Sequence, residues 1–195
     1  MKVNLKEAIW LNEPAVWEAT ETALTVTTDA NTDFWRKTHY GFTRDSGHFL
    51  GIAVDDGFTA HVRVQGKFRS LYDQAGLMVR IDENRWVKTG VEFTDGERFL
   101  SAVITDGKSD WSVSQPFKGL EDFYIRVTLK SGAMRIQASS DGRTWPLLRL
   151  APFPEVSHYL VGLTACTPER GGLDVRFSEF SVGPPITTDL HDLTA

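Results

Sequence analysis

Side chains that could bind a ligand recur at alternate positions between residues 72 and 114. Successive side chains of a strand point to opposite faces, so residues two apart share a face. One such face carries an indole, charges of both signs and several hydroxyls: Arg80, Trp86, Lys88, Glu92, Ser101, Asp110 and Ser112. Ligand sites combine an aromatic surface with a few polar groups in this way. The pattern predicts a shallow polar groove, with an ordinary solvated sheet face as the alternative.

Neighbouring segments could extend this groove. Tyr72 and Gln74 enter the first of the strands concerned and are expected at the rim. Trp35 lies with Phe34 in a segment without periodicity, which predicts a loop, and ligand contacts are frequent in loops. We expect Phe34 to plug the edge of the core and keep Trp35 as a candidate ligand contact. Glu92 is the carboxylate we expect to contact a ligand, held by a hydrogen bond from Tyr72 or Gln74.

Four strands must position the groove, and we predict them at residues 75–81, 86–93, 98–105 and 109–114. Asp95-Gly96 and Asp106-Gly107 are two-residue hairpin signals, and a three-residue turn joins the first two strands. This arrangement sets Arg80 opposite Lys88, an unfavourable pair of cations. Its other face is expected to be buried through Val87, Val91, Leu100, Ala102 and Trp111. The turn signals and the apolar patterns agree, which strengthens the prediction.

The rest of the chain alternates in short runs divided by Gly-, Asp- and Pro-containing turns. We expect a hairpin of residues 48–54 and 58–64 around Asp55-Asp56-Gly57, and another of residues 123–129 and 134–138 around Ser131-Gly132. Residues 159–166 and 173–182 supply the last strands. The chain shows no convincing helix. It is therefore expected to be an all-β, single-domain antiparallel two-sheet sandwich over residues 1–183, with residues 184–195 as a loosely held tail.

Composition argues against several classes of partner and cofactor. The formal net charge is −5 without a long run of Lys or Arg, which disfavours binding to nucleic acid. No apolar stretch approaches the roughly 20 residues of a membrane helix, and no secretory apolar region follows Met1. Cys166 is the single cysteine, so we expect a buried thiol in a cytoplasmic protein. The histidines are scattered and Asp55-Asp56 alone cannot hold calcium, so we expect no metal and no cofactor.

Four segments resemble the hallmark segments of a known family: Thr32-Asp33-Phe34-Trp35, residues 72–77, residues 86–92 and Ser109-Asp110-Trp111-Ser112. On these motifs the chain resembles, from Trp10 to Phe180, a domain-of-unknown-function family that includes the regulation-of-enolase protein. The resemblance implies the concanavalin A-like lectin/glucanase fold, a jelly roll whose concave face often binds sugar. Bacterial glucanases of that superfamily carry acids in the pattern Glu-x-Asp-x-Glu on one strand. The matching face here offers a single acid, Glu92.

Three functions remain open. The first is a non-catalytic domain that binds a carbohydrate or another polyhydroxylated small molecule on the concave sheet face. The second is a regulatory protein–protein interaction domain acting on a metabolic enzyme. The third is a glycoside hydrolase or lyase that uses Glu92.

Spacing separates the first and third hypotheses. The predicted strands put Glu92 and Asp110 roughly 16 Å apart, whereas glycosidase carboxyl pairs lie about 5 to 9.5 Å apart. A catalytic pair would exist only if Asp33 or Asp73 folded over Glu92 from a loop. We therefore assign no catalytic residue and favour the binding domain.

Overall fold

Strands form nearly all of the regular structure in the computed structural model, which describes residues 3–55, 57–114 and 119–194. Seven strands form what we call the front sheet, in the order β1 (Ile9–Leu11), β6 (His48–Asp55), β15 (His158–Cys166), β8 (Gln74–Arg80), β9 (Arg85–Thr94), β10 (Glu97–Asp106) and β11 (Lys108–Val113). Seven others form the back sheet, in the order β14 (Leu147–Pro152), β13 (Ala133–Ser139), β12 (Asp122–Lys130), β7 (Phe58–Gly66), β16 (Asp174–Gly183), β3 (Ala23–Thr27) and β2 (Val16–Ala19).

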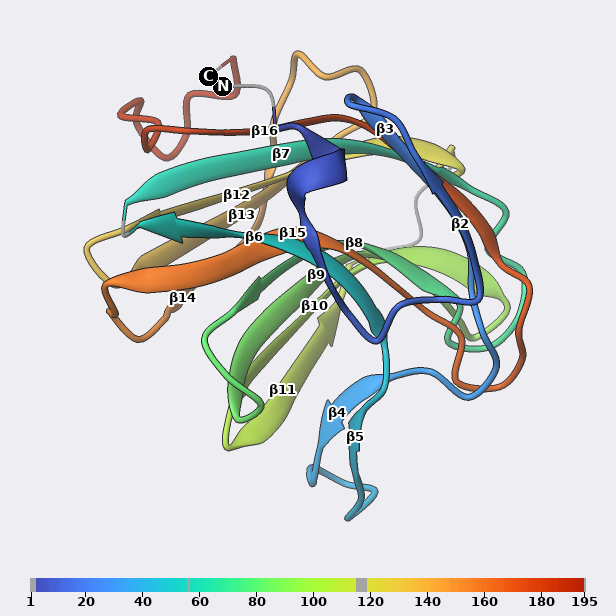
Figure 1. The fold of residues 1–195 in the computed structure, drawn as a ribbon. Coiled ribbons are helices and arrows are strands. Elements are labelled where there is room, and N and C mark those ends of the chain that lie inside the picture. Colours follow the sequence, from blue (N-terminus) through green and yellow to red (C-terminus); the bar gives the residue numbers. More distant parts are fainter. Residues whose placement is uncertain (1–2, 56, 115–118, 195) are drawn as a thin grey trace.

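The two sheets stack face to face, and a small hairpin lies outside them. That hairpin pairs β4 (Phe34–Arg36) with β5 (Thr43–Asp45), and Figure 1 shows it beyond the front sheet, on the side away from the back sheet. The turn η1 (Leu5–Glu7) precedes β1. The described chain is thus an all-β antiparallel two-sheet sandwich, as predicted.

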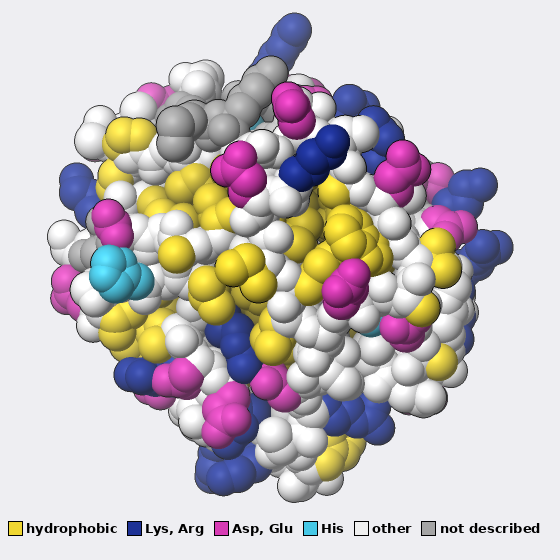
Figure 2. Space-filling view, in the orientation of Figure 1, with side chains coloured by type: hydrophobic (Ala, Val, Ile, Leu, Met, Phe, Trp, Pro, Cys, Tyr) yellow, Lys and Arg dark blue, Asp and Glu magenta, His cyan; other side chains and the backbone are white. Residues whose placement is uncertain are grey.

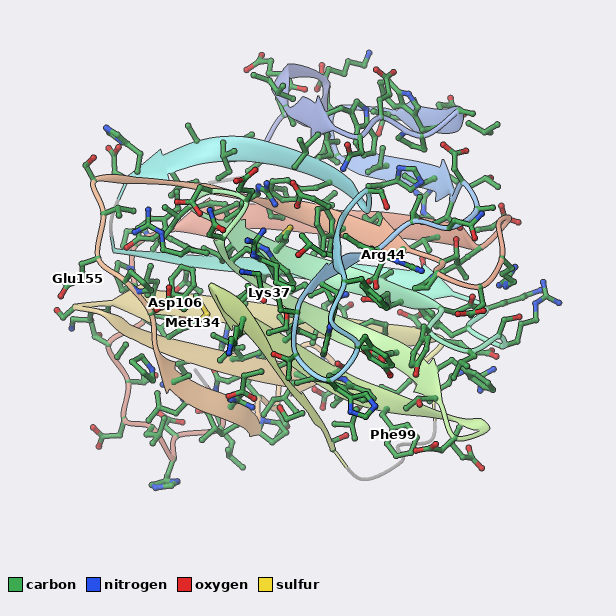
Figure 3. The ribbon with its side chains drawn as sticks, turned by 90° about the horizontal axis from the view of Figure 1, so that it is seen from below. Lys37, Arg44, Phe99, Asp106, Met134 and Glu155 are labelled. Atoms are coloured by element: carbon green, nitrogen blue, oxygen red, sulfur yellow. The ribbon has the colours of Figure 1, made fainter. Side chains whose placement is uncertain are left out.

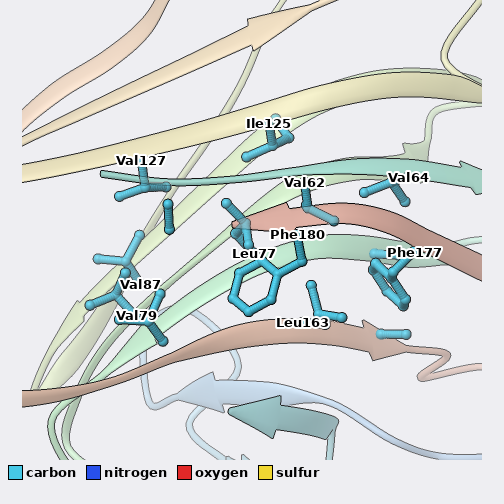
Figure 4. Close-up of a cluster of buried hydrophobic side chains, with 14 of the residues drawn as sticks. Val62, Val64, Leu77, Val79, Val87, Ile125, Val127, Leu163, Phe177 and Phe180 are labelled. Atoms are coloured by element: carbon cyan, nitrogen blue, oxygen red, sulfur yellow. The ribbon is translucent and has the colours of Figure 1, made fainter. Parts of the chain in front are cut away.

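The main core fills the space between the sheets. Val62 and Ile125 of the back sheet gather with Leu77, Val87 and Leu163 of the front sheet, and all five side chains are buried (Figure 4). They occupy the alternating apolar positions of their strands. Burial at about 25 cal/mol per Å² therefore stabilises the stack and fixes which face of each strand points inward. The even-numbered residues of β8 and β9 consequently point outward, away from the back sheet.

Two predicted hairpins have the predicted register. In the turn Asp95-Gly96 both residues have positive φ, 51° and 79°, as a two-residue type I′ turn requires. Val91 accordingly lies opposite Leu100. Ser131-Gly132 also has positive φ at both residues, and β12 pairs with β13 as expected. Local turn chemistry was enough to predict these two pairings.

The register between β8 and β9 differs from the prediction by two residues. The Asp82 carboxylate pairs with Arg85 at 2.6 Å, which closes the turn one residue earlier than expected. Arg80 therefore lies opposite Trp86, and the predicted opposition of Arg80 and Lys88 is wrong. A shift of two keeps every side chain on its predicted face.

The strand β11 presents the opposite face from the one predicted. It pairs with β10 as far as Asp106 and Lys108, with one residue between them instead of the expected two-residue turn. A shift of one residue turns every side chain to the other face. Trp111 consequently lies on the outer face of the front sheet and is 37% exposed, so its assignment to the core is wrong. The placement of Asp110 and Ser112 on the outer face is wrong for the same reason.

The strands β6 and β7 are formed as expected but do not pair with each other. β6 lies between β1 and β15 in the front sheet, whereas β7 lies between β12 and β16 in the back sheet. The chain crosses between the sheets after Asp55; Asp56, part of the predicted turn, lies outside the described residues. Leu50 and Val62 still face the shared core from its two sides. Alternation thus identified the apolar faces but not the partner strands.

The described part of the C-terminal segment, residues 184–194, is hydrogen-bonded to the rest of the chain. The Arg135 guanidinium donates to the carbonyl oxygens of residues 188–190, and the backbone N–H of Trp145 donates to the Leu193 carbonyl. The sequence predicts no partner for this segment, because backbone acceptors leave no residue pattern.

Acidic and basic side chains are interspersed over the face of the molecule shown in Figure 2.

Candidate ligand-binding site

Residues 33–45, which we call the cover, lie across the outer face of the front sheet. Figure 3 shows Lys37 and Arg44 of the cover in front of this sheet. Phe34 of the cover packs on Trp86 with ring centroids 6.0 Å apart, and both rings are fully buried with Met78 in a second apolar cluster. The prediction of an open groove over Trp86 is therefore wrong. This part of the outer face is a small core, and Trp86 cannot stack on a ligand.

Two ion pairs hold the cover on the sheet. Arg80 binds Asp45 through two hydrogen bonds of 2.7 and 2.8 Å, and Lys88 Nζ donates to Asp33 Oδ1 at 2.9 Å. Both cations are buried, so each needs a partner to offset its desolvation. The two cations, predicted as an unfavourable opposed pair, are each neutralised by an acid 35 or 55 residues away in the chain. Arg80 thus binds the cover to the front sheet through Asp45.

A pocket of about 260 Å³ opens where the connection between β4 and β5 meets the front sheet. Its walls are largely aromatic, with Trp35, Tyr40, Phe42, Tyr72 and Trp111, completed by Val103 and Pro168. Its polar lining consists of Asp33, Arg44, Gln74, Lys88, Glu92 and Glu169. Pockets for drug-sized ligands span about 300 to 1,000 Å³. This one has the size for a small molecule or for one group of a larger ligand.

The aromatic walls stand nearly perpendicular to one another. Trp35 lies edge-on to Trp111, with centroids 6.5 Å apart and planes at 86°, and edge-on to Tyr40 at 5.7 Å and 70°. Tyr72 meets Trp111 at 6.5 Å and 77°. The hydroxyls of Tyr40 and Tyr72 are 3.0 Å apart in a hydrogen bond. That bond, together with burial, raises the pKa of Tyr72 to about 12, so its hydroxyl stays neutral at physiological pH.

A buried carboxyl and a buried ammonium form the polar floor. Glu92 accepts a hydrogen bond from Ser101 Oγ at 2.9 Å, and Ser101 Oγ accepts one from the Trp111 indole at 3.2 Å. Burial raises the pKa of Glu92, although Lys88 and Ser101 favour its ionised form. Burial alone would lower the pKa of Lys88, but attraction to Asp33, Cys166 and Glu92 raises it overall. The floor thus holds a fixed cation and an acid that keeps its proton more readily than usual.

Of the loop acids considered for a catalytic pair with Glu92, the structure brings one to the pocket. Asp33 lines it, paired with Lys88. Asp73 is fully buried instead, bound by Arg170 through hydrogen bonds of 3.0 and 2.6 Å. The pocket therefore contains two carboxyl groups near its floor, one of which already has a cationic partner.

Half of the predicted ligand contacts line this pocket: Trp35, Tyr72, Gln74, Lys88 and Glu92. Ser101 supports Glu92 and lines an adjoining cavity of about 20 Å³. Arg80 and Trp86 lie under the cover. Asp110 and Ser112 lie on the other face, where both accept hydrogen bonds from Arg149 of β14. Glu92 is held by Ser101 on the neighbouring strand; the expected hydrogen bond from Tyr72 or Gln74 does not form, since Tyr72 Oη binds Tyr40 and Gln74 donates to the Tyr72 carbonyl.

Sequence reasoning missed the remaining lining residues: Tyr40, Phe42, Arg44, Val103, Trp111, Pro168 and Glu169. Trp111 was missed because the predicted register of β11 placed it on the core face of the sheet. Tyr40 and Phe42 stand close to Trp35 in an aperiodic segment, and that density of aromatic residues in a loop was the available signal. Pro168 and Glu169 leave no such signal.

Two glycines let β8 and β9 approach closely beside the floor. Gly76 and Gly90 pair with each other and line the smaller cavity. A Cβ on Gly76 would lie 1.9 Å from the Thr89 carbonyl oxygen, and one on Gly90 would lie 2.0 Å from that of Ala75. Since no Cβ fits at these distances, the local shape of the sheet depends on glycine at both positions.

Neither a metal cluster nor a membrane helix is found in the described part of the chain. No three His, Cys, Asp or Glu side chains among residues 3–55, 57–114 and 119–194 gather closely enough to hold a metal ion. The helical turn η1 is three residues long, and no described helix reaches the length and apolarity needed to cross a bilayer.

The fold and the site define a class: a jelly-roll-like two-sheet sandwich with an aromatic pocket on the outer face of one sheet. The chain belongs to the family described as "Protein of unknown function (DUF1349)", which matches residues 10–185. The resemblance inferred from the four sequence segments is therefore confirmed.

Relatives from yeast cover almost the whole chain. It is 57% identical over 190 residues to "Regulation of enolase protein 1" of Saccharomyces cerevisiae, covering 97% of this chain and 96% of that protein. A crystal structure of "a functionally unknown protein from Saccharomyces cerevisiae" shares 56% identity and a TM-score of 0.92, covering 94% of this chain and all of that one.

More distant structures share the fold. A GH43 protein of Bacillus licheniformis, BlXynB, matches with a TM-score of 0.70 at 12% identity, over 93% of this chain and 39% of that chain. A GH43B protein from a Bacteroides ovatus xyloglucan locus matches with a TM-score of 0.63 at 17% identity, over 84% and 33%. Likeness at this level of identity shows the architecture alone.

Proposed function

We propose that this chain is a non-catalytic binding domain that takes a carbohydrate or another polyhydroxylated small molecule into the aromatic pocket. The observation that carries the proposal is Trp111, whose ring is partly exposed directly beside a buried polar floor. An indole face packs on the apolar face of a sugar ring, and a few fixed polar groups then bond its hydroxyls. Trp111 takes the role that sequence analysis had given to Trp86.

The polar groups of the floor are fixed before any ligand arrives. Lys88 is held by Asp33, and Glu92 by Ser101, so little side-chain entropy is lost when they bind hydroxyls. Lys88 is a hydrogen-bond donor, and the Glu92 carboxyl offers acceptor oxygens. This combination of donors and acceptors is suited to hydroxyl groups, which both donate and accept.

A glycan array followed by titration calorimetry on the strongest hits tests the proposal. Trp111→Ala should weaken binding at least tenfold, about 1.4 kcal/mol. Trp17→Ala is the matched control, because Trp17 is 39% exposed, close to the 37% of Trp111, and lies on β2 away from the pocket. Equal affinity of wild type and Trp111→Ala, or no saturable binding of any glycan, would contradict the proposal.

A second candidate is a regulatory protein–protein interaction domain acting on a metabolic enzyme. The observation in its favour is the name of the 57% identical relative, "Regulation of enolase protein 1". The single buried thiol Cys166 supports a cytoplasmic location for the chain. Such a location would put the chain in the same compartment as a metabolic enzyme of the cytoplasm. Titration of purified enolase into the chain tests this function. Saturable binding that Trp111→Ala leaves unchanged would favour an interaction surface outside the pocket.

A further inference from the structure

Four aromatic side chains close a circuit around the pocket. Trp35 contacts Tyr40 and Trp111 edge-on, Trp111 contacts Tyr72, and the hydroxyls of Tyr72 and Tyr40 complete the ring at 3.0 Å. The angles between the contacting planes are 70°, 86° and 77°, so adjacent rings stand roughly perpendicular to each other, as the walls of an aromatic box do. Aromatic boxes of this kind attract cations, because each ring presents a negative face.

Acidic side chains outnumber basic ones by three to two around the box. The acidic residues are Asp33, Glu92 and Glu169, and the basic ones are Lys88 and Arg44. Asp33 and Lys88 neutralise each other through their ion pair, and Lys88 is buried below the walls. Glu92 at the floor and the exposed Glu169 are left as acids, and neither has an ion pair with a described residue.

Arg44 is already engaged with the aromatic rim. Its guanidinium carbon lies 4.6 Å from the centroid of the Phe42 ring, and Phe42 stacks on Tyr40 at 5.3 Å and 15°. The edge of the box therefore holds one cation by the same interaction that its interior offers. The interior is lined by two indoles, which bind cations better than phenyl rings do.

We propose that the pocket binds an alkylammonium group, a quaternary or methylated amine, with Trp35, Tyr72 and Trp111 against the cation and Glu92 as its counter-ion. The inference rests on the proposed function in one respect, that this pocket is the ligand site. It goes further in naming a charged group of the ligand. A volume of about 260 Å³ is enough for a trimethylammonium head with a short hydroxylated chain.

Paired probes that differ in charge test this directly. Choline is titrated against its uncharged carbon isostere 3,3-dimethylbutan-1-ol, at matched ionic strength, by calorimetry or by tryptophan fluorescence. We expect choline to bind at least tenfold more tightly than the isostere. A short peptide that carries Nε-trimethyllysine is the third probe, since the same group occurs on free metabolites and on modified proteins. Its affinity relative to choline distinguishes these sources.

Variants separate the rings from the counter-ion. Trp111→Leu keeps an apolar wall and should lose at least tenfold in choline affinity, Trp111→Phe should restore part of it, and Trp17→Leu should change nothing. Glu92→Gln keeps the shape of the floor and should weaken choline binding about fivefold or more while leaving the isostere unchanged. Thermal melts of each variant confirm that it is folded.

The outcomes are distinct from those of the glycan experiment. Equal affinity for choline and the isostere, no choline binding at millimolar concentration, or choline binding that survives Trp111→Leu would each overturn the alkylammonium inference. Glycan binding that depends on Trp111 would still stand in those cases. Choline binding without any glycan binding would retain the pocket and its cation specificity and reject the polyhydroxylated ligand.

Discussion

Replacing Trp86 tests whether the cover is a structural lid over a second core or a ligand-facing flap. Trp86 is fully buried against Phe34 and Met78, whereas Trp111, two strands away on the same face of the sheet, is 37% exposed. The sequence pattern predicts the reverse, with Trp111 buried and Trp86 facing a ligand. The two substitutions to alanine should therefore have opposite consequences for stability and for binding.

The expected magnitudes follow from burial. A tryptophan side chain removes about 200 Å² from water, which at about 25 cal/mol per Å² is worth at most about 5 kcal/mol. Trp86→Ala should cost about 3 to 5 kcal/mol, as large-to-small substitutions in cores do. Trp111→Ala should cost about 1 to 2 kcal/mol, because part of its ring is already solvated and water can replace it in the open pocket.

A third variant uses the indole N–H of Trp86, which is buried without a hydrogen-bond partner. An unsatisfied buried donor costs about 1 to 3 kcal/mol. Trp86→Phe removes that donor while keeping a ring against Phe34, so we expect a loss of under about 2 kcal/mol. Urea denaturation followed by circular dichroism gives all three free energies of unfolding. The reasoning is refuted if Trp86→Ala is no more destabilising than Trp111→Ala.

Further predictions concern the floor and the sheet. Burial raises the pKa of Glu92 in the folded state, so as pH rises the unfolded chain loses this proton first. The free energy of unfolding therefore falls as pH rises from the ordinary carboxyl range through the folded pKa. The Glu92→Gln variant has no carboxyl to titrate at this position. Its free energy of unfolding relative to wild type, measured by urea denaturation from about pH 4 to about pH 8, should therefore increase with pH. A difference that stays constant with pH would contradict the raised pKa. Lys88→Met should lower the free energy of unfolding by about 3 to 5 kcal/mol, because it leaves Asp33 buried and unpaired. The double variant Lys88→Met with Asp33→Asn should lose less than the sum of the two single variants. Additive losses in this double-mutant cycle would show that the pair is not coupled. Gly90→Ala should lower the free energy of unfolding by about 1 to 3 kcal/mol, because its Cβ meets the neighbouring strand. A thermal melt measures the loss, and an unchanged melting temperature would mean that the strands can separate freely.

Local signals predicted the main strands of the two sheets and two of the turns, because they act over a few residues. The segment with Phe34 and Trp35, predicted as a loop, instead forms the short strand β4. Asp95-Gly96 is a strong signal for a two-residue turn with positive φ at both positions, so the pairing of β9 with β10 could be derived. The pairing of β8 with β9 failed by two residues because the Asp82 side chain binds Arg85 and moves the turn. The face of β11 failed because a turn one residue different inverts the whole strand.

The site itself depends on contacts that no local pattern contains. Asp33 and Asp45 neutralise Lys88 and Arg80 from far away in the chain, and Phe34 turns an outward indole into a buried one. Alternation correctly placed Lys88 and Glu92 on the outer face, since it reports only the side of the sheet. It could not show that residues 33–45 fold back over that face and divide it into a small core and a pocket.

If the pocket between the cover and the front sheet binds a small molecule, the tryptophan side chains that line it should respond to the ligand. The chain has 6 tryptophans, and their indole N–H groups give separate signals in a ¹H–¹⁵N correlation spectrum, assignable by single Trp→Phe variants. On titration with glycans and with choline, the signals of Trp35 and Trp111 should shift saturably while that of Trp17 stays in place. Saturable shifts at Trp17 with none at Trp35 and Trp111, or no shift with any of these compounds, would contradict the account.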